Sequence, residues 1–554
     1  MGEFIEFHMG GIAKNAGLCG LVYILESLGA IENKDYVIGN NKIQIEKAYF
    51  DNVNWADAYI KSHVGRFCGD LPIDRLIDRM KEILRLNSLE KDTKTKWTDI
   101  CKKIKEMETK RYGPAFSFIA DISEEYRKKV NHILSLITSL DKKEIGSTNI
   151  KQLIEYFSEE TIYEFLAFAD IKLFLPAFWN NVSFLNRSLY KKNNRKTYED
   201  FFIKKMKTYE NEKYKTKGKS LCVECGNKTA EYFNLGFINQ INDAKRKTSQ
   251  FWNMNNQSVV CPECAWIYTL MPLGFTKIGG DFLFINVNGN LKDLIRLNRK
   301  NTYYIDEKAK GKSYLYQKVS IDMLEVYERN SQYGKNGRCG IQIDLRISDP
   351  KKGYINEISI LDSSIIKIFH DCKSDFAKIY GKFIKCNDES INVYDQVITR
   401  LLNKQSLFQF LDQLMQISMQ NGIYISSLYH ILSIESNRRK NDLMNQDKLK
   451  NNALIYGKKM REILVSNSGK DNKNLENKLR GIVYKLQNSI RTNNSEYFTD
   501  VLINLYTSYG LSIPSFVIEC LDNDKIFQIA GRAYLIGLTQ EFLTEKKENN
   551  KNEN

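Results

Sequence analysis

Two pairs of cysteines constrain this chain more than any other feature of its sequence. Cys222 and Cys225 form one CxxC pair, Cys261 and Cys264 form a second, and 35 residues separate the two pairs. Two residues between cysteines let both thiolates point the same way, so two such pairs supply the four sulfur ligands of a closed tetrahedral site. The spacing therefore predicts a structural Zn²⁺, or another tetrahedral metal ion, held by these four cysteines.

Other interpretations of the pairs stay open from the sequence. A redox-active CxxC needs only one pair and a thioredoxin-like βαβ frame, and chance clustering is the third alternative. Catalytic zinc is disfavoured, because four cysteines leave no open position for water. The gap is longer than the roughly 15–20 residues of a compact site, so we expect a zinc-ribbon-like element with an insertion, spanning about residues 218–268. Metal binding contributes about 10–16 kcal/mol in zinc peptides, which is sufficient to hold a segment without its own core.

The length and composition indicate a soluble protein of several domains. A chain of 554 residues exceeds one ordinary core and predicts two to four domains. We expect no transmembrane helix and no membrane partner, because no run of about 18 apolar residues occurs. The acidic start of the chain lacks the basic and apolar regions of a secretory signal. The seven cysteines outside the pairs are scattered and odd in number, which favours the reducing cytoplasm over a disulfide framework.

The charge balance favours a polyanionic partner. The chain holds 82 Lys and Arg against 67 Asp and Glu, which is a net charge of +15. An excess of this size is typical of proteins that bind nucleic acid. A solvated surface from a lysine-rich proteome would produce the same excess, and the many Lys, Asn and Ile residues fit that alternative.

Hydrophobic periodicity predicts an α+β fold that is predominantly helical. Residues 1–300 indicate an N-terminal mixed α/β domain with the zinc element inserted into it. Residues 301–395 indicate a strand-rich middle region, and residues 396–545 a C-terminal α-helical bundle. Residues 546–554 are polar and predict a disordered tail.

Some segments carry sharper predictions. Residues 12–28 show the apolar stripe of a helix, on which Gly17 and Gly20 indicate the close approach of another backbone. Residues 36–45 predict a hairpin. Residues 479–490 show a clean apolar stripe at helical spacing.

Three loops combine basic residues with asparagine or aromatic side chains and are candidate nucleic-acid surfaces. They lie at residues 178–196, 213–219 and 245–256. Lys and Arg hold phosphate, Asn contacts base edges, and aromatic rings stack on bases. A disordered polar loop is the alternative for the third, and basic residues of the C-terminal bundle extend the set. The candidate contacts are Asn180, Asn181, Lys191, Lys192, Arg195, Lys245, Arg246, Lys247, Trp252, Asn255, Arg438, Arg439, Lys485 and Arg491.

Motifs that would indicate an enzyme are incomplete. The two Gly-Lys-Ser triplets lack the P-loop glycine five residues earlier. Gly279-Gly-Asp-Phe282 has Phe where nucleotide cyclases and polymerases carry a second acidic residue, and His370-Asp371 has no accompanying His and Asp ligands. We predict no catalytic residues and therefore no enzyme, with a nuclease or nucleotidyl enzyme built on Asp281 or on the His370-Asp371 pair as the alternative.

Several of these features together resemble a known family. They are the two CxxC pairs, the opening segment 15–20, the segment 178–185 and the glycine-containing helix segment 527–537. In combination they resemble the CRISPR-associated CXXC-CXXC family, the large subunit of type I-B Cascade complexes. The resemblance spans most of the chain but rests on short motifs, and residues 300–395 match none of them.

The resemblance implies a non-catalytic subunit of a crRNA-guided antiviral complex in the cytoplasm. Such proteins recognise a protospacer-adjacent motif on double-stranded DNA, help open the duplex for R-loop formation with crRNA, and recruit a helicase-nuclease. The implied partners are crRNA, target double-stranded DNA, the backbone, crRNA 5′-handle and small subunits, and the helicase-nuclease. The family's metal positions map onto the four paired cysteines. A zinc-stabilised protein scaffold is a further alternative.

Overall fold

The structure, a computed structural model, describes most of the chain. The described residues are 3–69, 71–85, 91–106, 112–140, 147–172, 175–178, 194–212, 220–234, 259–278, 281–287, 289–299, 341–349, 353–361, 363–386, 389–421, 425–439, 446–467 and 472–540. They belong to two compact units, the first within Met1–Thr302 and Gln342–Ile358, the second within Tyr303–Ile341 and Ser359–Asn554. Residues 301–340 of the predicted middle region and the predicted tail at 546–554 lie outside the described residues.

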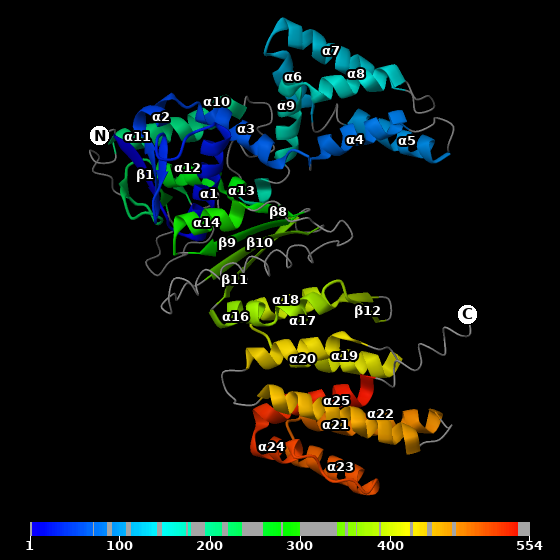
Figure 1. Cartoon of the computed structure of the whole chain (residues 1–554). Coiled ribbons are helices and arrows are strands. Elements are labelled where there is room, and N and C mark those ends of the chain that lie inside the picture. Colours follow the sequence, from blue (N-terminus) through cyan, green and yellow to red (C-terminus); the bar gives the residue numbers. More distant parts are fainter. Residues whose placement is uncertain are drawn as a thin grey trace, which may run out of the picture. The chain divides into compact units, whose positions relative to one another are not determined.

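Both units are mainly helical and the sheets are small, which confirms the predicted fold class (Figure 1). The N-terminal part of the first unit comprises β1 (Phe4–His8), α1 (Ile12–Ser27), β2 (Tyr36–Ile38), β3 (Lys42–Glu46), α2 (Lys47–Asn52), α3 (Trp55–Phe67), α4 (Pro72–Arg85), α5 (Lys91–Glu106), α6 (Gly113–Ala120), α7 (Glu124–Ser139), α8 (Ser147–Ser158) and α9 (Glu160–Ile171). The rest comprises the 3-10 helix η2 (Leu175–Ala177), α10 (Asn194–Tyr198), the π-helix η5 (Glu199–Ile203), α11 (Lys204–Glu212), β4 (Ser220–Leu221), β5 (Lys228–Thr229), β6 (Phe233–Asn234), β7 (Val259–Val260), α12 (Pro262–Thr269), α13 (Met271–Gly274), β8 (Thr276–Ile278), β9 (Asp281–Val287), α14 (Leu291–Arg299), β10 (Ile341–Asp349) and β11 (Gly353–Leu361). Among the described helices, none is both long and apolar enough to cross a membrane.

An antiparallel sheet in the order β1-β3-β2 opens the first unit. β2 and β3 are the hairpin predicted at 36–45, and the N–H of Gly39 donates to the carbonyl of Lys42 at 2.8 Å across its turn. β1 lies at the edge of the sheet and pairs with β3, with Ile5 opposite Ile45. Its burial alternates along the strand, as expected for a sheet that faces the core on one side.

Helix α1 confirms the helix predicted at 12–28 and runs very close to α12 and α13. A Cβ atom on Gly17 would lie 2.1 Å from the carbonyl oxygen of Ile267. A Cβ atom on Gly20 would lie 2.1 Å from the carbonyl oxygen of Leu270. Since no side chain fits there, the two glycines provide the close approach that the sequence predicts.

Trp266 of α12 joins the segments that follow the cysteine pairs to the N-terminal core. Its ring centroid lies 5.5 Å from that of Phe7 on β1. It also lies 5.2 Å from Trp55 and 5.9 Å from Phe50, both in edge-to-face geometry. The residues around the second cysteine pair are therefore part of the main core of the unit.

A buried carboxylate connects three helices of the first unit, α4, α6 and α9. Asp170 of α9 accepts the N–H of Ile73 at 2.8 Å and the hydroxyl of Tyr112 at 2.7 Å. These two bonds connect α9 to the first turn of α4 and to the start of α6. Four other strands form a sheet in the order β11-β10-β9-β8, while β4 pairs with β5 and β6 pairs with β7 in two separate sheets.

In its described residues the second unit is a helical bundle with one short hairpin. Its elements are α16 (Ser363–Asp371), α17 (Lys373–Ile379), β12 (Phe383–Cys386), β13 (Glu389–Asn392), α18 (Val393–Leu402), α19 (Phe408–Asn421), α20 (Ser427–Arg438), α21 (Gln446–Asn467), α22 (Asn472–Arg491), α23 (Ser495–Ser508), α24 (Phe516–Asp522) and α25 (Asp524–Gln540). α21 and α25 touch backbone to backbone, because Cβ atoms on Gly457 and Gly537 would each lie 2.2 Å from a carbonyl oxygen of the other helix. The buried Arg532 of α25 makes two hydrogen bonds, of 2.8 and 2.7 Å, to the carboxylate of Asp412 on α19.

Candidate metal centre

The first cysteine pair lies in a tight turn after β4. The N–H of Cys222 donates to the carbonyl of Asn227 at 2.9 Å, and the N–H of Gly226 donates to the carbonyl of Cys222 at 2.8 Å. Gly226 has a φ of +72°, which residues with a side chain rarely adopt. The turn therefore needs glycine directly after Cys225.

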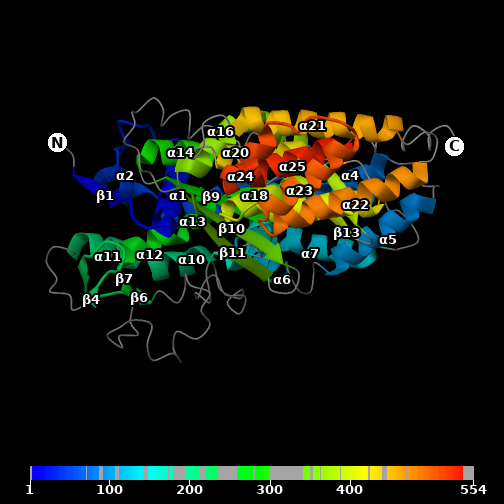
Figure 2. The same cartoon turned by 90° about the horizontal axis from the view of Figure 1, so that it is seen from below.

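The second pair begins helix α12, and the two pairs are joined by backbone contacts. The sulfur of Cys261 caps α12 by accepting the N–H of Cys264 at 3.5 Å. The N–H of Val223 donates to the carbonyl of Val259 at 3.0 Å, which fixes the first pair beside β7. Figure 2 shows the short strands β4, β6 and β7 near α11 and α12.

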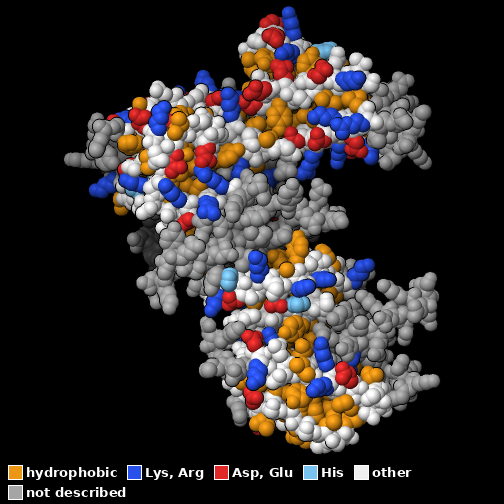
Figure 3. All heavy atoms as spheres, in the orientation of Figure 1, with side chains coloured by type: hydrophobic (Ala, Val, Ile, Leu, Met, Phe, Trp, Pro, Cys, Tyr) orange, Lys and Arg blue, Asp and Glu red, His pale blue; other side chains and the backbone are white. Residues whose placement is uncertain are grey.

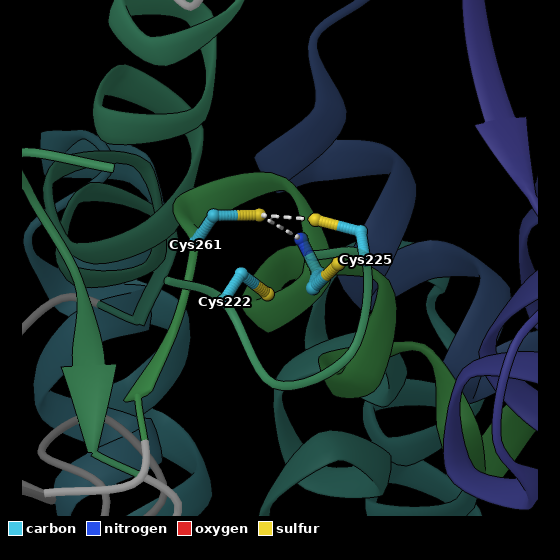
Figure 4. A group of neighbouring side chains, drawn as sticks. Cys222, Cys225 and Cys261 are labelled. Carbon is cyan, nitrogen blue, oxygen red and sulfur yellow. Dashed lines mark hydrogen bonds between the residues drawn. The ribbon is translucent and has the colours of Figure 1, made fainter. Parts of the chain in front are cut away.

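The four sulfur atoms lie within 4.8 Å of one another. Figure 4 shows the thiols of Cys222, Cys225 and Cys261 turned toward a common centre. The sulfurs of Cys225 and Cys261 are 3.8 Å apart. Tetrahedral Zn–S bonds of about 2.3 Å separate sulfurs by about 3.8 Å, so the cluster has the size of a zinc tetrathiolate. The residues fit a metal ion as predicted, and zinc as its identity stays a prediction.

The pKa values of the thiols shift in opposite directions, because the four sulfurs lie so close together. Cys222, Cys261 and Cys264 are buried, and Cys225 is half-buried. Hydrogen bonds from the neighbouring thiols, that of Cys225 first, lower the pKa of Cys222. The interaction with Cys222 raises the pKa of Cys264. Four thiolates at this spacing repel one another, and a divalent cation bound between them would offset that repulsion.

Glu224, inside the first pair, connects the cluster to the start of α1. Its carboxylate accepts hydrogen bonds from the N–H of Gly11 and from the hydroxyl of Tyr268 on α12. A Cβ atom on Gly10 would collide with this carboxylate. Glu224, which lies between the two cysteines of the first pair, therefore contacts the N-terminal segment directly.

Lys14 of α1 brings a positive charge to the same place. It is only 2% exposed. Burial opposes its charge, but the negative charges of Cys264 and Glu263 raise the pKa of Lys14 above its ordinary value. A zinc tetrathiolate carries a net charge of about −2, which this ammonium group would partly offset. Sequence reasoning missed Lys14 and Glu224, although a lysine inside an apolar helix segment was a usable signal.

Most predicted nucleic-acid contacts lie outside the described residues. These are Asn180, Asn181, Lys191, Lys192, Lys245, Arg246, Lys247, Trp252 and Asn255. The half-buried Arg195 is described, and its guanidinium donates to Asp57 at 2.8 Å and to Glu164. The structure thus assigns Arg195 two carboxylate partners inside the first unit.

Arg438 and Arg439 also contact a carboxylate. Glu435 is fully buried in the second unit. Arg438 donates to both of its oxygens at 2.8 Å, and Arg439 donates to one of them at 3.0 Å. These two arginines satisfy a buried charge, which is a structural role that the sequence did not reveal.

Lys485 and Arg491 lie on the exposed side of α22. The same side carries Arg480 and Tyr484, and the tyrosine is 72% exposed. Tyr484 was not predicted, because only the apolar stripe of this helix was informative in the sequence. That stripe is confirmed, since Leu479, Val483, Leu486 and Ile490 are buried and Ile482 is half-buried.

The residues considered for an enzyme site do not gather a third ligand in the described chain. Nδ1 of His370 lies 3.0 Å from Asp371, and the pair is on the surface. Asp281 begins β9 and is half-buried. Across the described ranges, the four cysteines are the one set of three or more metal-ligating side chains within reach of a single ion.

Comparison with protein families identifies the segment that holds this centre. A model of the CRISPR-associated protein family Cas_CXXC_CXXC matches residues 215–276. The matched segment contains all four cysteines and α12, so the match supports a CRISPR-associated CXXC-CXXC protein. No curated protein and no solved structure matches the chain.

Proposed function

We propose that the chain is the non-catalytic large subunit of a type I-B CRISPR Cascade complex. It would recognise a protospacer-adjacent motif on double-stranded DNA, aid duplex opening and R-loop formation, and recruit a helicase-nuclease in the cytoplasm. The observation that carries the proposal is the coincidence of the family match at 215–276 with four sulfurs at metal-binding distances. Guide pairing would supply sequence specificity, while the protein reads the short motif and the backbone.

In this proposal the metal is Zn²⁺ and its role is structural. Four cysteine ligands close the coordination shell, so no position is open for water or substrate. The turn of the first pair contacts α1 through Glu224 and Gly11, and the second pair begins α12. The ion would therefore hold the ends of the inserted segment against the N-terminal core.

Nucleic acid is expected to contact the exposed side of α22 as well as the loops at 178–196 and 245–256. Arg480, Tyr484 and Arg491 occur at i, i+4 and i+11 on α22, which places them on one helix face. Arg and Lys hold phosphates, and an exposed tyrosine offers a ring on which a base stacks. On the face shown in Figure 3, lysine and arginine are interspersed with acidic side chains and form no broad basic surface. We therefore expect nucleic acid to contact a narrow basic strip on α22, which we call the α22 track.

The decisive experiment expresses the tagged chain with its genomic neighbours and measures zinc and RNA after purification. The proposal expects about one zinc per chain, a discrete crRNA-length RNA and several partner proteins. Zinc without RNA or partners would support the protein-scaffold alternative instead. Cleavage of DNA or RNA by the purified chain with Mg²⁺ or Mn²⁺ would establish the nuclease alternative.

DNA binding by the purified complex tests the α22 track. A surface that neutralises Z phosphates loses affinity with a log–log salt slope of about −0.9Z on duplex DNA. We expect Tyr484→Ala and Lys485→Ala to weaken binding. The control is Tyr497→Ala on α23, because Tyr497 is also exposed and belongs to no proposed track. Equal binding by all three proteins would contradict the track.

A further inference from the structure

A cavity of about 1270 Å³ lies in the first unit beside the metal centre. Strand β1, α11, the turn of the first cysteine pair and Lys14 of α1 line it. Small-molecule pockets measure about 300–1,000 Å³, so this cavity is large for a small ligand. Its position next to β1 points to a different kind of occupant.

Among the described strands β1 pairs only with β3, and its residues line this cavity. It is the outer strand in the order β1-β3-β2. The N–H of Lys47 donates to the carbonyl of Glu3, and the N–H of Met9 donates to the carbonyl of Asn41, so odd-numbered residues of β1 bond to β3. Because bonding alternates along an antiparallel strand, the N–H and C=O groups of Phe4, Glu6 and His8 point away from β3. Such an edge is a template for another extended chain.

The lining of the cavity is acidic, in contrast to the chain as a whole. It contains six carboxylates and four lysines. The carboxylates are Glu3, Glu6, Asp51, Glu210, Glu224 and Glu263. The whole chain has a net charge of +15, but the carboxylates gathered in this cavity would repel a phosphate backbone. A second copy of the same acidic edge would be repelled too.

We infer that this cavity binds an extended segment of a partner protein as a fourth strand on β1, with lysine or arginine side chains directed at the carboxylates. Backbone hydrogen bonds to Phe4, Glu6 and His8 would supply affinity, and the acidic lining would select the segment. The exposed ring of Phe4, at 42%, would pack on its apolar side chains. The choice of partner, another protein of the CRISPR complex, rests on the proposed function.

The test uses a photo-crosslinking amino acid in place of Phe4 in the full chain, expressed with its genomic neighbours. The expected product joins position 4 to a Lys- or Arg-containing peptide of a co-purified protein. His8→Pro removes an outward N–H without affecting the β3 ladder, and His8→Ala keeps that N–H. We expect His8→Pro to lower the cross-link yield at least 10-fold and His8→Ala to retain it.

A charge-reversed pair covers the case in which His8→Pro does not fold. Asp51→Lys changes an exposed lining residue, and Asp78→Lys makes the same change on α4 outside the cavity. Only Asp51→Lys should lower the yield of the cross-link from position 4, because only this change places a positive charge in the cavity.

Cross-linking to nucleic acid, absence of a product, or equal yields in each pair would overturn the inference. Loss of crRNA co-purification would instead contradict the proposed function. The cross-link at position 4 would still show whether a protein segment binds in the cavity.

Discussion

The side-chain amide of Asn15 donates a hydrogen bond to the amide oxygen of Asn286 at 2.8 Å, across 271 positions of sequence. The oxygen of Asn15 accepts the N–H of Gly10 at 2.9 Å, and the amide of Asn286 donates to Gln342 at 2.9 Å. Asn15 and Asn286 are both buried. This row of amides joins α1 to β9 and β10 within the first unit, and each member satisfies the next.

Replacing Asn15 should destabilise the first unit. Asn15→Leu leaves the N–H of Gly10 and the oxygen of Asn286 without their partner, which costs about 1–3 kcal/mol for each buried group. All five tryptophans precede residue 302, so tryptophan fluorescence during urea unfolding reports on this unit. The exposed Asn52→Leu is the matched control and should stay within about 0.5 kcal/mol of the original protein. Equal stabilities of the two variants would contradict the network.

Removing one sulfur should remove the metal. Cys264→Ser is expected to lower the metal content from about one ion per chain to near zero and to destabilise the first unit by several kcal/mol, because structural metal binding is part of the folding free energy. Elemental analysis and tryptophan fluorescence measure the two effects. Cys68→Ser changes an exposed cysteine outside the cluster and should alter neither. Full metal content in Cys264→Ser would refute a four-sulfur site.

Two glycine substitutions should have opposite effects on stability. Gly17→Ala places a Cβ 2.1 Å from the backbone of Ile267, so the helices must separate and the free energy of unfolding should fall by about 2 kcal/mol or more. Gly65→Ala on α3 meets only the hydroxyl of Tyr23 at 3.8 Å and should raise stability by about 0.5–1 kcal/mol through helix propensity. Thermal unfolding of both variants checks the sign of each effect. A stabilised Gly17→Ala protein would show that the close crossing is wrong.

The first unit should lose stability in mild acid through His63. Burial lowers the pKa of His63 from 6.5 to about 4, and its Nδ1 lies 2.7 Å from the carbonyl of Tyr59. Between these two pH values the unfolded chain binds more protons than the folded chain. Stability therefore falls as the pH drops from 6.5 toward 4, by about 3 kcal/mol in total from this group.

Urea unfolding at several pH values measures this slope. His63→Asn retains a side-chain N–H but cannot titrate, so its slope in this window should be smaller. His132→Asn changes an exposed histidine on α7 and should leave the slope unaltered. A His63→Asn protein with the original pH dependence would assign the acid sensitivity to other groups.

Arginines of the second unit should separate into structural and binding groups. Removing Arg438 and Arg439 together leaves Glu435 buried without its ion pairs and should destabilise this unit by about 3–5 kcal/mol. Lys485→Ala with Arg491→Ala should change stability by no more than about 0.5 kcal/mol and reduce the salt slope of DNA binding by about 0.9 for each phosphate that is no longer neutralised. Circular dichroism during urea unfolding and DNA titrations at several salt concentrations measure the two effects. A stable Arg438/Arg439 double variant with weakened DNA binding would reverse the assignment.

The sequence was informative wherever a function depends on residues close together in the chain. CxxC spacing brings two thiols to one turn by local geometry, so both pairs could be recognised without the fold. The stripe at 479–490 and the hairpin at 36–45 also depend on local periodicity and turn residues, and both are present. Gly17 and Gly20 predicted a close approach but not the identity of the approaching helix.

By itself the sequence determined the ligand set, the helical character and the helix surfaces, because each depends on residue type and short-range spacing. Only the tertiary structure decided which distant groups meet: Lys14 and Glu224 at the sulfur cluster, Arg195 with Asp57, and both C-terminal arginines with Glu435. The physical reason is that a buried charge takes whichever opposite charge the packing brings near, and packing depends on the whole chain. A basic residue in the sequence therefore does not reveal whether it serves the core or a nucleic acid.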